Sequence, residues 1–411
     1  MKAVVHIGMP KTGSTTIQRW LTENEAALAK QGYALARHSM ADPAQSGFHE
    51  VSIGLRTAAG MSLDPKKFMA QKTGITSYED QQAYAQRYEA HLTALIAQSQ
   101  AHTLVFSAGD ISQIGRMGDP SEATAQVQAA DRWLRQFFDD IRYILYLRRP
   151  EDWFTSAYVQ RLKNGYALDF ETYYENVRRF GDWSKLALAW REGVGPDRLV
   201  MRIMERDVLH NGDLTEDFAR ILGLDATQCA STTMRNQAPS AAAVTFLQSI
   251  NRRCADDPEF AKARADLVHD LRNFLRANTD HGPKFQLPAD VVEKIRSDFA
   301  QSNEVLRQTF FPELAEIFPA RAQAAPHPDA ATKIADDMAV LAVEFAHWGL
   351  SKHRNLTGDG QSGAVSEAKP TDPGQLPVDV EQAWDNDGDI LVTTGNRSSH
   401  SAILFQPEGR T

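Results

Sequence analysis

Short apolar runs alternate with longer amphipathic stretches over the first half of the chain. The runs at residues 2–7, 103–106, 142–147 and 198–203 each contain at least three consecutive apolar residues. Runs of this length are typical of buried strands, and the stretches between them favour helices. Strands separated by helices form parallel sheets covered on both faces. The pattern therefore predicts an α/β fold with a parallel sheet flanked by helices.

Helical patterns fill the intervals between these strands. We expect helices from the residues after Gly13 through Leu28, at 79–100, at 121–139, around Ser156, Tyr158 and Arg161, and from Leu214 to Ile221. From residue 239 to about 320 the pattern becomes mostly helical, and residues 329–350 form one more amphipathic helix. The sheet is thus expected to be followed by a helical C-terminal part.

The composition changes after Asn355. From there to Thr411 the chain carries nine acidic residues against three Lys or Arg, with many Gly, Ser and Pro. Such segments bury too little apolar surface to order themselves. The apolar runs 390–392 and 402–405 form a candidate hairpin, which alone is marginally stable. Residues 355–411 are interpreted as an acidic linker and tail.

Overall composition narrows the class of protein. The chain of 411 residues is 42% hydrophobic and 24% charged, and its formal net charge of -9 argues against a basic nucleic-acid-binding protein. Cys229 and Cys254 match neither a disulfide scaffold nor a metal motif. The first apolar run is too short for a signal peptide, and no run is long enough to span a bilayer. We expect a cytoplasmic protein without a transmembrane segment or a nucleic-acid partner.

The stretch HIGMPKTGSTT, residues 6–16, predicts an anion-binding loop between the first strand and the first helix. The first N–H groups of a helix lack intrahelical partners, and the helix dipole adds positive charge at that end. Phosphate and sulfate bind at such positions. Gly8 and Gly13 allow close approach of the backbone, Lys11 adds a full charge, and Ser14, Thr15 and Thr16 add hydroxyl donors.

This loop departs from the nucleotide-triphosphate motif G-x-x-x-x-G-K-[ST]. Gly8 and Gly13 have its spacing, but Ser14 stands at the lysine position and the lysine has moved to Lys11. The usual lysine reaches the β- and γ-phosphates beside magnesium, so the shift disfavours a metal-dependent NTPase. An ordinary strand-to-helix turn punctuated by Gly and Pro is the alternative interpretation.

A second candidate anion site lies in YLRRPEDWFTSAYVQRLKNG, residues 146–165. Arg148 ends a predicted strand and can bind an anion through two parallel hydrogen bonds. Ser156, eight residues later on the following helix, can add a hydroxyl to the same group. Considered without the first motif, Arg148 is interpreted as a solvent-exposed charge at the end of a strand. Two anion sites at the ends of strands in one sheet favour a nucleotide with phosphates at both ends.

Together these motifs resemble the sulfotransferases that use 3′-phosphoadenosine 5′-phosphosulfate (PAPS). Residues 11–16, KTGSTT, resemble the 5′-phosphosulfate loop, and Arg148, Pro150 and Ser156 resemble the 3′-phosphate motif. The N-terminal HIGxxKTG is similar to bacterial sulfotransferase-like proteins. The similarity extends to about residue 315, including the Asn236 segment and Asn303, and leaves out the tail. Residues 1–320 are then expected to form one sulfotransferase-like domain, with residues 239–320 on the acceptor side.

The resemblance implies an enzyme with PAPS as co-substrate and no metal. It implies that Lys11 stabilises the bridging oxygen, that Thr12, Gly13, Ser14, Thr15 and Thr16 hold the 5′ side, and that Arg148 and Ser156 hold the 3′-phosphate. Position 149, where the family often has Asn, is Arg here, and we expect it to make the pocket more positive.

The base that removes the acceptor's proton is left open between two residues. Asp110 ends the strand before the Arg148 strand, in a region where related sulfotransferases place His or an acidic residue, although an Asp there is more often a turn former or a helix cap. His49 titrates near neutrality and can take a proton directly, or is a loop histidine without a role. Glu50 and His38 are further candidates.

The acceptor is expected to be a glycan or small metabolite with a hydroxyl or amine. Trp153, Tyr158, Tyr166 and Tyr173 can offer stacking surfaces, although aromatic residues at helical spacing are more often core. A nucleotide-dependent phosphotransferase and a non-catalytic nucleotide-binding module remain as alternative functions. The patterns do not specify the oligomeric state.

Overall fold

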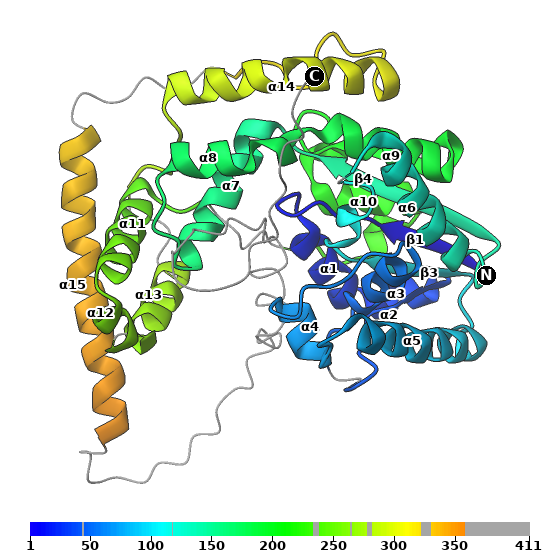
Figure 1. Cartoon of the computed structure of the whole chain (residues 1–411), viewed down its shortest axis with the longest axis horizontal. Helices are drawn as coiled ribbons and strands as arrows, with labels where there is room; N and C mark the ends of the chain where they lie inside the picture. Colours follow the sequence, from blue (N-terminus) through cyan, green and yellow to red (C-terminus); the bar gives the residue numbers. More distant parts are fainter. Residues whose placement is uncertain are drawn as a thin grey trace, which may run out of the picture.

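Within the part of the chain that the structure describes, five parallel strands form one sheet (Figure 1). The computed structural model describes residues 1–42, 45–116, 118–232, 238–263, 265–277, 282–321 and 330–357. The strands lie in the order β2-β3-β1-β4-β5. They are β1 (Lys2–His6), β2 (Tyr33–Leu35), β3 (Thr103–Ser107), β4 (Asp140–Leu147) and β5 (Leu199–Ile203). The predicted α/β fold with a parallel sheet flanked by helices is confirmed.

The helices that follow the strands surround the sheet. The α-helices of this part are α1 (Ser14–Glu23), α2 (Glu25–Lys30), α3 (Glu50–Ala58), α4 (Phe68–Thr73), α5 (Tyr78–Gln98), α6 (Pro120–Leu134), α7 (Pro150–Lys163), α8 (Phe170–Val177), α9 (Trp183–Val194) and α10 (Leu214–Leu222). The 3₁₀ turns are η1 (Ile111–Gln113), η2 (Arg178–Gly181), η3 (Pro196–Arg198), η4 (His210–Gly212) and η5 (Ala226–Gln228).

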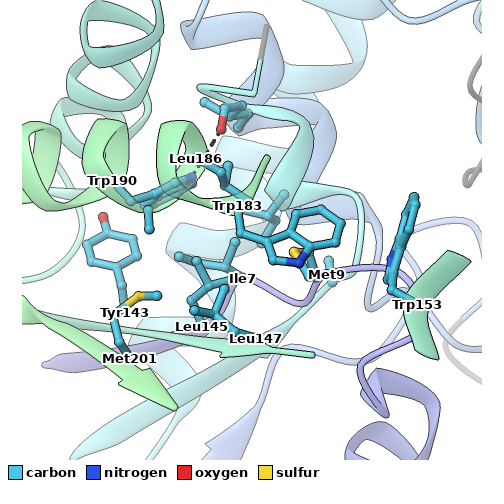
Figure 2. Close-up of a cluster of buried hydrophobic side chains, with 14 of the residues drawn as sticks. Ile7, Met9, Tyr143, Leu145, Leu147, Trp153, Trp183, Leu186, Trp190 and Met201 are labelled. Atoms are coloured by element: carbon cyan, nitrogen blue, oxygen red, sulfur yellow. Dashed lines mark hydrogen bonds between the residues drawn. The ribbon is translucent and has the colours of Figure 1, made fainter. Parts of the chain in front are cut away.

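Two apolar cores lie on opposite faces of the sheet, because consecutive strand residues point to opposite sides. Val4 of β1 belongs to a cluster with Ile17 of α1 and Phe218 of α10. Val5 belongs to the larger cluster on the other face. Figure 2 shows part of that larger core, where Trp183, Leu186 and Trp190 of α9 lie over side chains of β4. The sheet is thus buried on both faces, and its functional groups must lie at its ends.

The described residues that follow the sheet are mostly helical. They are α11 (Ala241–Asp256), α12 (Pro258–Ala263), α13 (Ala265–Ala277), α14 (Ala289–Phe310) and α15 (Ala330–Thr357). In Figure 1, α15 lies along α11, α12 and α13, away from the sheet. The expected division into a domain at 1–320, a helix and a tail stays a prediction. The Asn236 segment and the candidate hairpin of the tail lie outside the described residues.

Several predicted boundaries shift for identifiable reasons. The helix expected through Leu28 is divided into α1 and α2 at Asn24, whose side-chain Oδ1 accepts a hydrogen bond from the Ala230 N–H at 2.6 Å. The edge strand β2 was not predicted, because three residues are too few to show a period. The helix expected to reach residue 139 ends at Leu134, and Phe138 turns into the core instead.

Candidate functional site

The candidate site lies where the strand order reverses. From β1 the chain crosses to β2 and β3 on one side of the sheet, and from β3 it crosses back over β1 to β4. Ligands of open α/β sheets bind outside the carboxyl ends of the strands at such a point. The loops that follow β1, β3 and β4 therefore meet at one edge. These loops contain Lys11, Asp110 and Arg148.

The loop after β1 has the backbone of an anion cradle. Gly8, Lys11 and Gly13 all have positive φ, at 57°, 66° and 80°. Gly13 is the N-cap of α1 and offers no side-chain acceptor, so the first N–H groups of the helix are left for an external partner. Thr15 and Thr16, both half-buried, lie in this first turn. The predicted loop therefore presents backbone donors at a helix N-terminus.

Two of the predicted hydroxyl groups are used to hold the loop together. The Thr12 hydroxyl donates to the carbonyl oxygen of Met9 at 2.6 Å, and the Ser14 hydroxyl lies 3.4 Å from the same oxygen. Both residues are buried. Thr12 and Ser14 thus stabilise the loop from inside, while its backbone N–H groups, Thr15 and Thr16 are the donors nearer its outer side.

Arg148 joins the second motif directly to this loop. Its Nη1 donates to the carbonyl oxygen of Lys11 at 2.8 Å. Lys11 Nζ in turn donates to Gln160 Oε1 of α7 at 2.9 Å. Ser156 lies half-buried on the same helix, one turn before Gln160. The structure therefore brings Lys11, Arg148 and the Ser156 helix together, as the two motifs predicted.

The environment of Arg148 favours an anionic partner. Burial lowers the pKa of its guanidinium, an effect opposed by the carboxylates of Asp152 and Glu205 and reinforced by Arg321. No carboxylate among the described residues forms an ion pair with Arg148 within contact distance. A half-buried cation without a direct counter-ion gains from a bound anion.

Two tryptophans fix the relative position of the two motifs. Trp153 Nε1 of α7 donates to the carbonyl oxygen of Pro10 at 2.8 Å, and Trp183 Nε1 of α9 donates to that of Arg148 at 3.1 Å. Their rings contact each other edge to face, with centroids 5.0 Å apart. In Figure 2 the ring of Trp183 lies beside Met9. Trp153 is thus core, as are Tyr158 and Tyr173.

The expectation that Arg149 makes the pocket more positive is wrong. Its side chain is buried and pairs with Glu205 at 2.9 Å and with Glu151 at 3.5 Å. Its Nη1 donates to the carbonyl oxygen of Pro319 at 2.7 Å. The charge is therefore neutralised locally, and the side chain anchors the segment after α14 to the end of β4.

The two candidate bases are neighbours in the structure. Asp110 Oδ1 lies 4.0 Å from His49 Nδ1, and both residues are buried. The Ser52 hydroxyl of α3 donates to Asp110 Oδ2, and Asp110 Oδ1 has no hydrogen-bond partner among the described residues. Burial lowers the pKa of His49, Asp110 opposes this effect, and Lys72 adds to it. His49 is therefore neutral at neutral pH and able to accept a proton.

Other candidates for the base are bound elsewhere. Glu50 accepts hydrogen bonds from the Ser39 hydroxyl and from the Met40 N–H. His38 Nε2 lies 3.6 Å from Glu25 Oε1, and the residue is half-buried. The backbone of Gly109 packs against Gly8 of the loop after β1. Because Asp110 follows Gly109, this packing places the His49–Asp110 pair near that loop.

This packing predicts a strong effect of a methyl group at Gly8. A Cβ there would lie 2.9 Å from Ser14 Oγ and 3.0 Å from the Gly109 Cα. We expect Gly8→Ala to lower the free energy of unfolding by about 1–3 kcal/mol more than Gly74→Ala does. Gly74 has a similar φ of 70° and no atom within 4 Å, so it isolates crowding from backbone strain. Urea unfolding measures both, and equal losses would contradict the close packing.

An open pocket of about 450 Å³ lies near the loop. Met204 and Leu214, which line it, are the side chains closest to Gly13. Glu205, Leu209 and Arg321 complete much of the wall. Its volume lies in the range of small-molecule sites.

Within the ranges that the structure describes, no cluster of three or more His, Cys, Asp or Glu side chains is arranged to hold a metal ion. Over the same ranges, none of the helices combines the length and the apolar character needed to cross a membrane.

Comparisons with known proteins give two weak matches. No protein-family model matches the sequence. An uncharacterized protein of Archaeoglobus fulgidus is 23% identical over 173 residues, which are 41% of this chain and 46% of that relative, less than half of its length. A crystal structure of a sulfotransferase from Alicyclobacillus acidocaldarius matches 75% of this chain and 94% of its own, with a TM-score of 0.39 and 11% identity. Function is therefore inferred from this chain's own residues.

Proposed function

We propose that this protein is a sulfotransferase that moves a sulfuryl group from PAPS to a hydroxyl or amine of a glycan or small metabolite. The observation that carries the proposal is the contact between Arg148 Nη1 and the carbonyl oxygen of Lys11, at 2.8 Å. This contact joins the helix N-terminus after β1 to an arginine after β4 that has no direct ion-pair partner among the described residues. A nucleotide with phosphates at both ends matches two such adjacent anion sites.

The residues present fit this co-substrate. The N–H groups at the start of α1, with Thr15 and Thr16, are suited to the 5′-phosphosulfate, and Arg148 and Ser156 to the 3′-phosphate. The pocket near Gly13 offers room for the nucleoside. Bound PAPS supplies an activated sulfuryl group on a phosphate leaving group.

Lys11 would act on the leaving group. Its ammonium lies on the loop itself, and its Nζ is held by Gln160 at 2.9 Å until a stronger, charged acceptor is present. From this position it can stabilise the negative charge that grows on the bridging oxygen as the bond breaks. Preorganised charges of this kind are usually the largest contribution to catalysis.

His49 would accept the proton of the acceptor, and Asp110 would orient it. A neutral imidazole beside a carboxylate can act as a general base, because the carboxylate stabilises the imidazolium that forms. The Ser52 hydroxyl lies within hydrogen-bond distance of both the other oxygen of Asp110 and the His49 carbonyl oxygen, the latter at 2.7 Å, and its one proton is shared between these two acceptors. The pair combines the two candidates from the sequence into one unit.

Calorimetric titration tests the nucleotide site without knowledge of the acceptor. We expect adenosine 3′,5′-bisphosphate to bind without metal, and Arg148→Ala to weaken this binding by roughly tenfold to a hundredfold, as expected for the loss of a charged hydrogen bond. Arg142→Ala is the matched control, because Arg142 lies exposed on β4, the strand that Arg148 follows.

ATP with magnesium is titrated alongside. Preferential binding of magnesium ATP, or no binding of the bisphosphate, would contradict the sulfotransferase and favour a phosphotransferase. Tight bisphosphate binding without transfer to any acceptor in a screen of glycans would instead favour a non-catalytic binding module.

A further inference from the structure

The long helix α15 lies at the edge of the molecule, away from the sheet, and packs against α11 and α13 with one of its faces (Figure 1). The apolar side chains of this inner face recur every three or four residues and belong to the larger apolar core or pack against it: Met338, Leu341, Phe345 and Trp348. Leu341 is completely buried, and the ring centroids of Phe345 and Phe274 of α13 lie 5.4 Å apart. The inner face therefore holds α15 to the rest of the protein.

The outer face of α15 carries a second apolar stripe. Val340 and Val343 are the two most exposed large apolar side chains that the structure describes, with exposed fractions of 47% and 70%. They lie one turn apart, and exposed alanines continue the stripe along the helix: Ala335, Ala339, Ala342 and Ala346. Single exposed apolar side chains are ordinary, but a contiguous stripe on one helix face indicates a contact surface.

The charge of α15 changes sign along the helix. Its first eight residues, AATKIADD, contain one lysine and two aspartates, and its last eight, LSKHRNLT, contain a lysine and an arginine and no acid. Two such helices side by side in antiparallel orientation place the acidic start of each beside the basic end of the other. Asp336 and Arg354 lie equally far on either side of Phe345, so an antiparallel pair centred there brings Asp336 of each copy opposite Arg354 of the other.

The chemistry of the stripe fits another such helix better than a membrane. Helices that lie on membranes carry Trp, Phe or Leu on the apolar face and many Lys or Arg on the polar face. The stripe of α15 contains only Ala and Val, and Asp336 is exposed near its start. Side chains of this size let two helix axes approach to about 8–10 Å. A second copy of the chain presents the same surface with complementary charges at its two ends.

We propose that α15 pairs in antiparallel orientation with α15 of a second copy of this chain, through Val340, Val343 and the alanines of the stripe, to form a two-fold homodimer. In such an interface the same surface of each copy contacts that of the other, so the surface must be self-complementary, as the charges of α15 are. One helix pair is a small interface compared with the roughly 800 Å² that each partner buries in a standard one, so we expect a dissociation constant in the micromolar range.

Sedimentation velocity of the full chain tests the proposal. We expect the wild-type protein to change from monomer to dimer between about 1 and 200 µM, because the dimer fraction follows mass action. Val343→Glu places a carboxylate in the apolar stripe of both copies and is expected to weaken the dimer at least about tenfold. Val208→Glu is the matched control, because Val208 is also exposed, at 38%, and follows β5 instead of lying on α15.

An exchange of charges tests the antiparallel orientation. Asp336→Lys and Arg354→Asp each create two pairs of like charges in a two-fold antiparallel dimer, and each is expected to weaken it about threefold to tenfold. The double variant restores opposite charges and should recover most of the affinity. In a parallel pair each of these residues lies opposite its own counterpart, so no such recovery is expected. Far-UV circular dichroism checks that every variant keeps its helix content.

Three outcomes would overturn the inference: a monomer at every concentration, a dimer that Val343→Glu leaves intact, or a double charge variant that dimerises no more tightly than the single ones. The dimer does not depend on the proposed sulfotransferase function, since α15 lies away from the sheet (Figure 1). Titration with adenosine 3′,5′-bisphosphate therefore tests the two separately. We expect Val343→Glu to bind the bisphosphate as tightly as the wild-type protein does, whether or not it forms a dimer.

Discussion

Lys11→Ala is expected to lower the turnover of PAPS by about a hundredfold to a thousandfold, the effect of removing one preorganised group that stabilises developing charge. The charge on the bridging oxygen is small in bound PAPS and grows as the sulfuryl group leaves. The loss should therefore appear in kcat, while the affinity for adenosine 3′,5′-bisphosphate changes much less.

Release of radioactive sulfate or sulfated acceptor from labelled PAPS measures this effect. The rate of transfer to water suffices where no acceptor has been found. Lys30→Ala, at the exposed end of α2, is the control for the loss of a lysine. A fall in kcat/KM that is fully explained by weaker bisphosphate binding would show that Lys11 holds the ground state and not the transition state.

The sequence predicted the groups of the site that are encoded within one short segment. Gly8, Lys11 and Gly13 follow a strand and precede a helix, so their spacing alone indicates the loop. Arg148 and Ser156 are likewise close in sequence: Arg148 directly follows β4, and Ser156 lies in the second turn of α7. Parallel strands with helical crossovers then place both segments at one edge of the sheet.

Contacts between distant segments could not be predicted in the same way. Gln160 meets Lys11 across 149 residues of sequence, and Ser52 meets Asp110 across 58. Nothing in the spacing of these residues indicates the contact, because it depends on how α3 and α7 pack. Arg149 was misjudged for this reason, since Glu205 and Pro319 reach it from elements far along the chain.

The identity of the general base could be predicted from the sequence only in part. The sequence placed His49 and Asp110 on a loop and at a strand end, and left the choice between them open. The structure puts their side chains 4.0 Å apart, so the choice becomes a question of which group takes the proton. Their effects on pH dependence differ, and this difference can be measured.

His49→Gln is expected to reduce sulfuryl transfer to a hydroxyl by about a hundredfold to ten-thousandfold, the range for loss of a general base. In the wild-type protein the rate should fall as the pH falls, because protonated His49 cannot accept a proton. Burial lowers the pKa of His49 below its ordinary value of 6.5, so the midpoint of the fall should lie below that value. Activity should be constant around neutral pH, where His49 is neutral. The acid limb should be absent from the residual activity of His49→Gln.

Two neighbouring charges should move this midpoint in opposite directions. Asp110 raises the pKa of His49, so Asp110→Asn should shift the acid limb to lower pH as well as reduce the rate. Lys72 lowers the same pKa from an exposed position on α4, so Lys72→Met should shift the limb to higher pH with little change in the plateau rate. Rate profiles against pH at saturating PAPS distinguish these shifts from general damage. If His49→Gln retains most of the activity while Asp110→Asn abolishes it, Asp110 is the base and His49 is the residue that positions it.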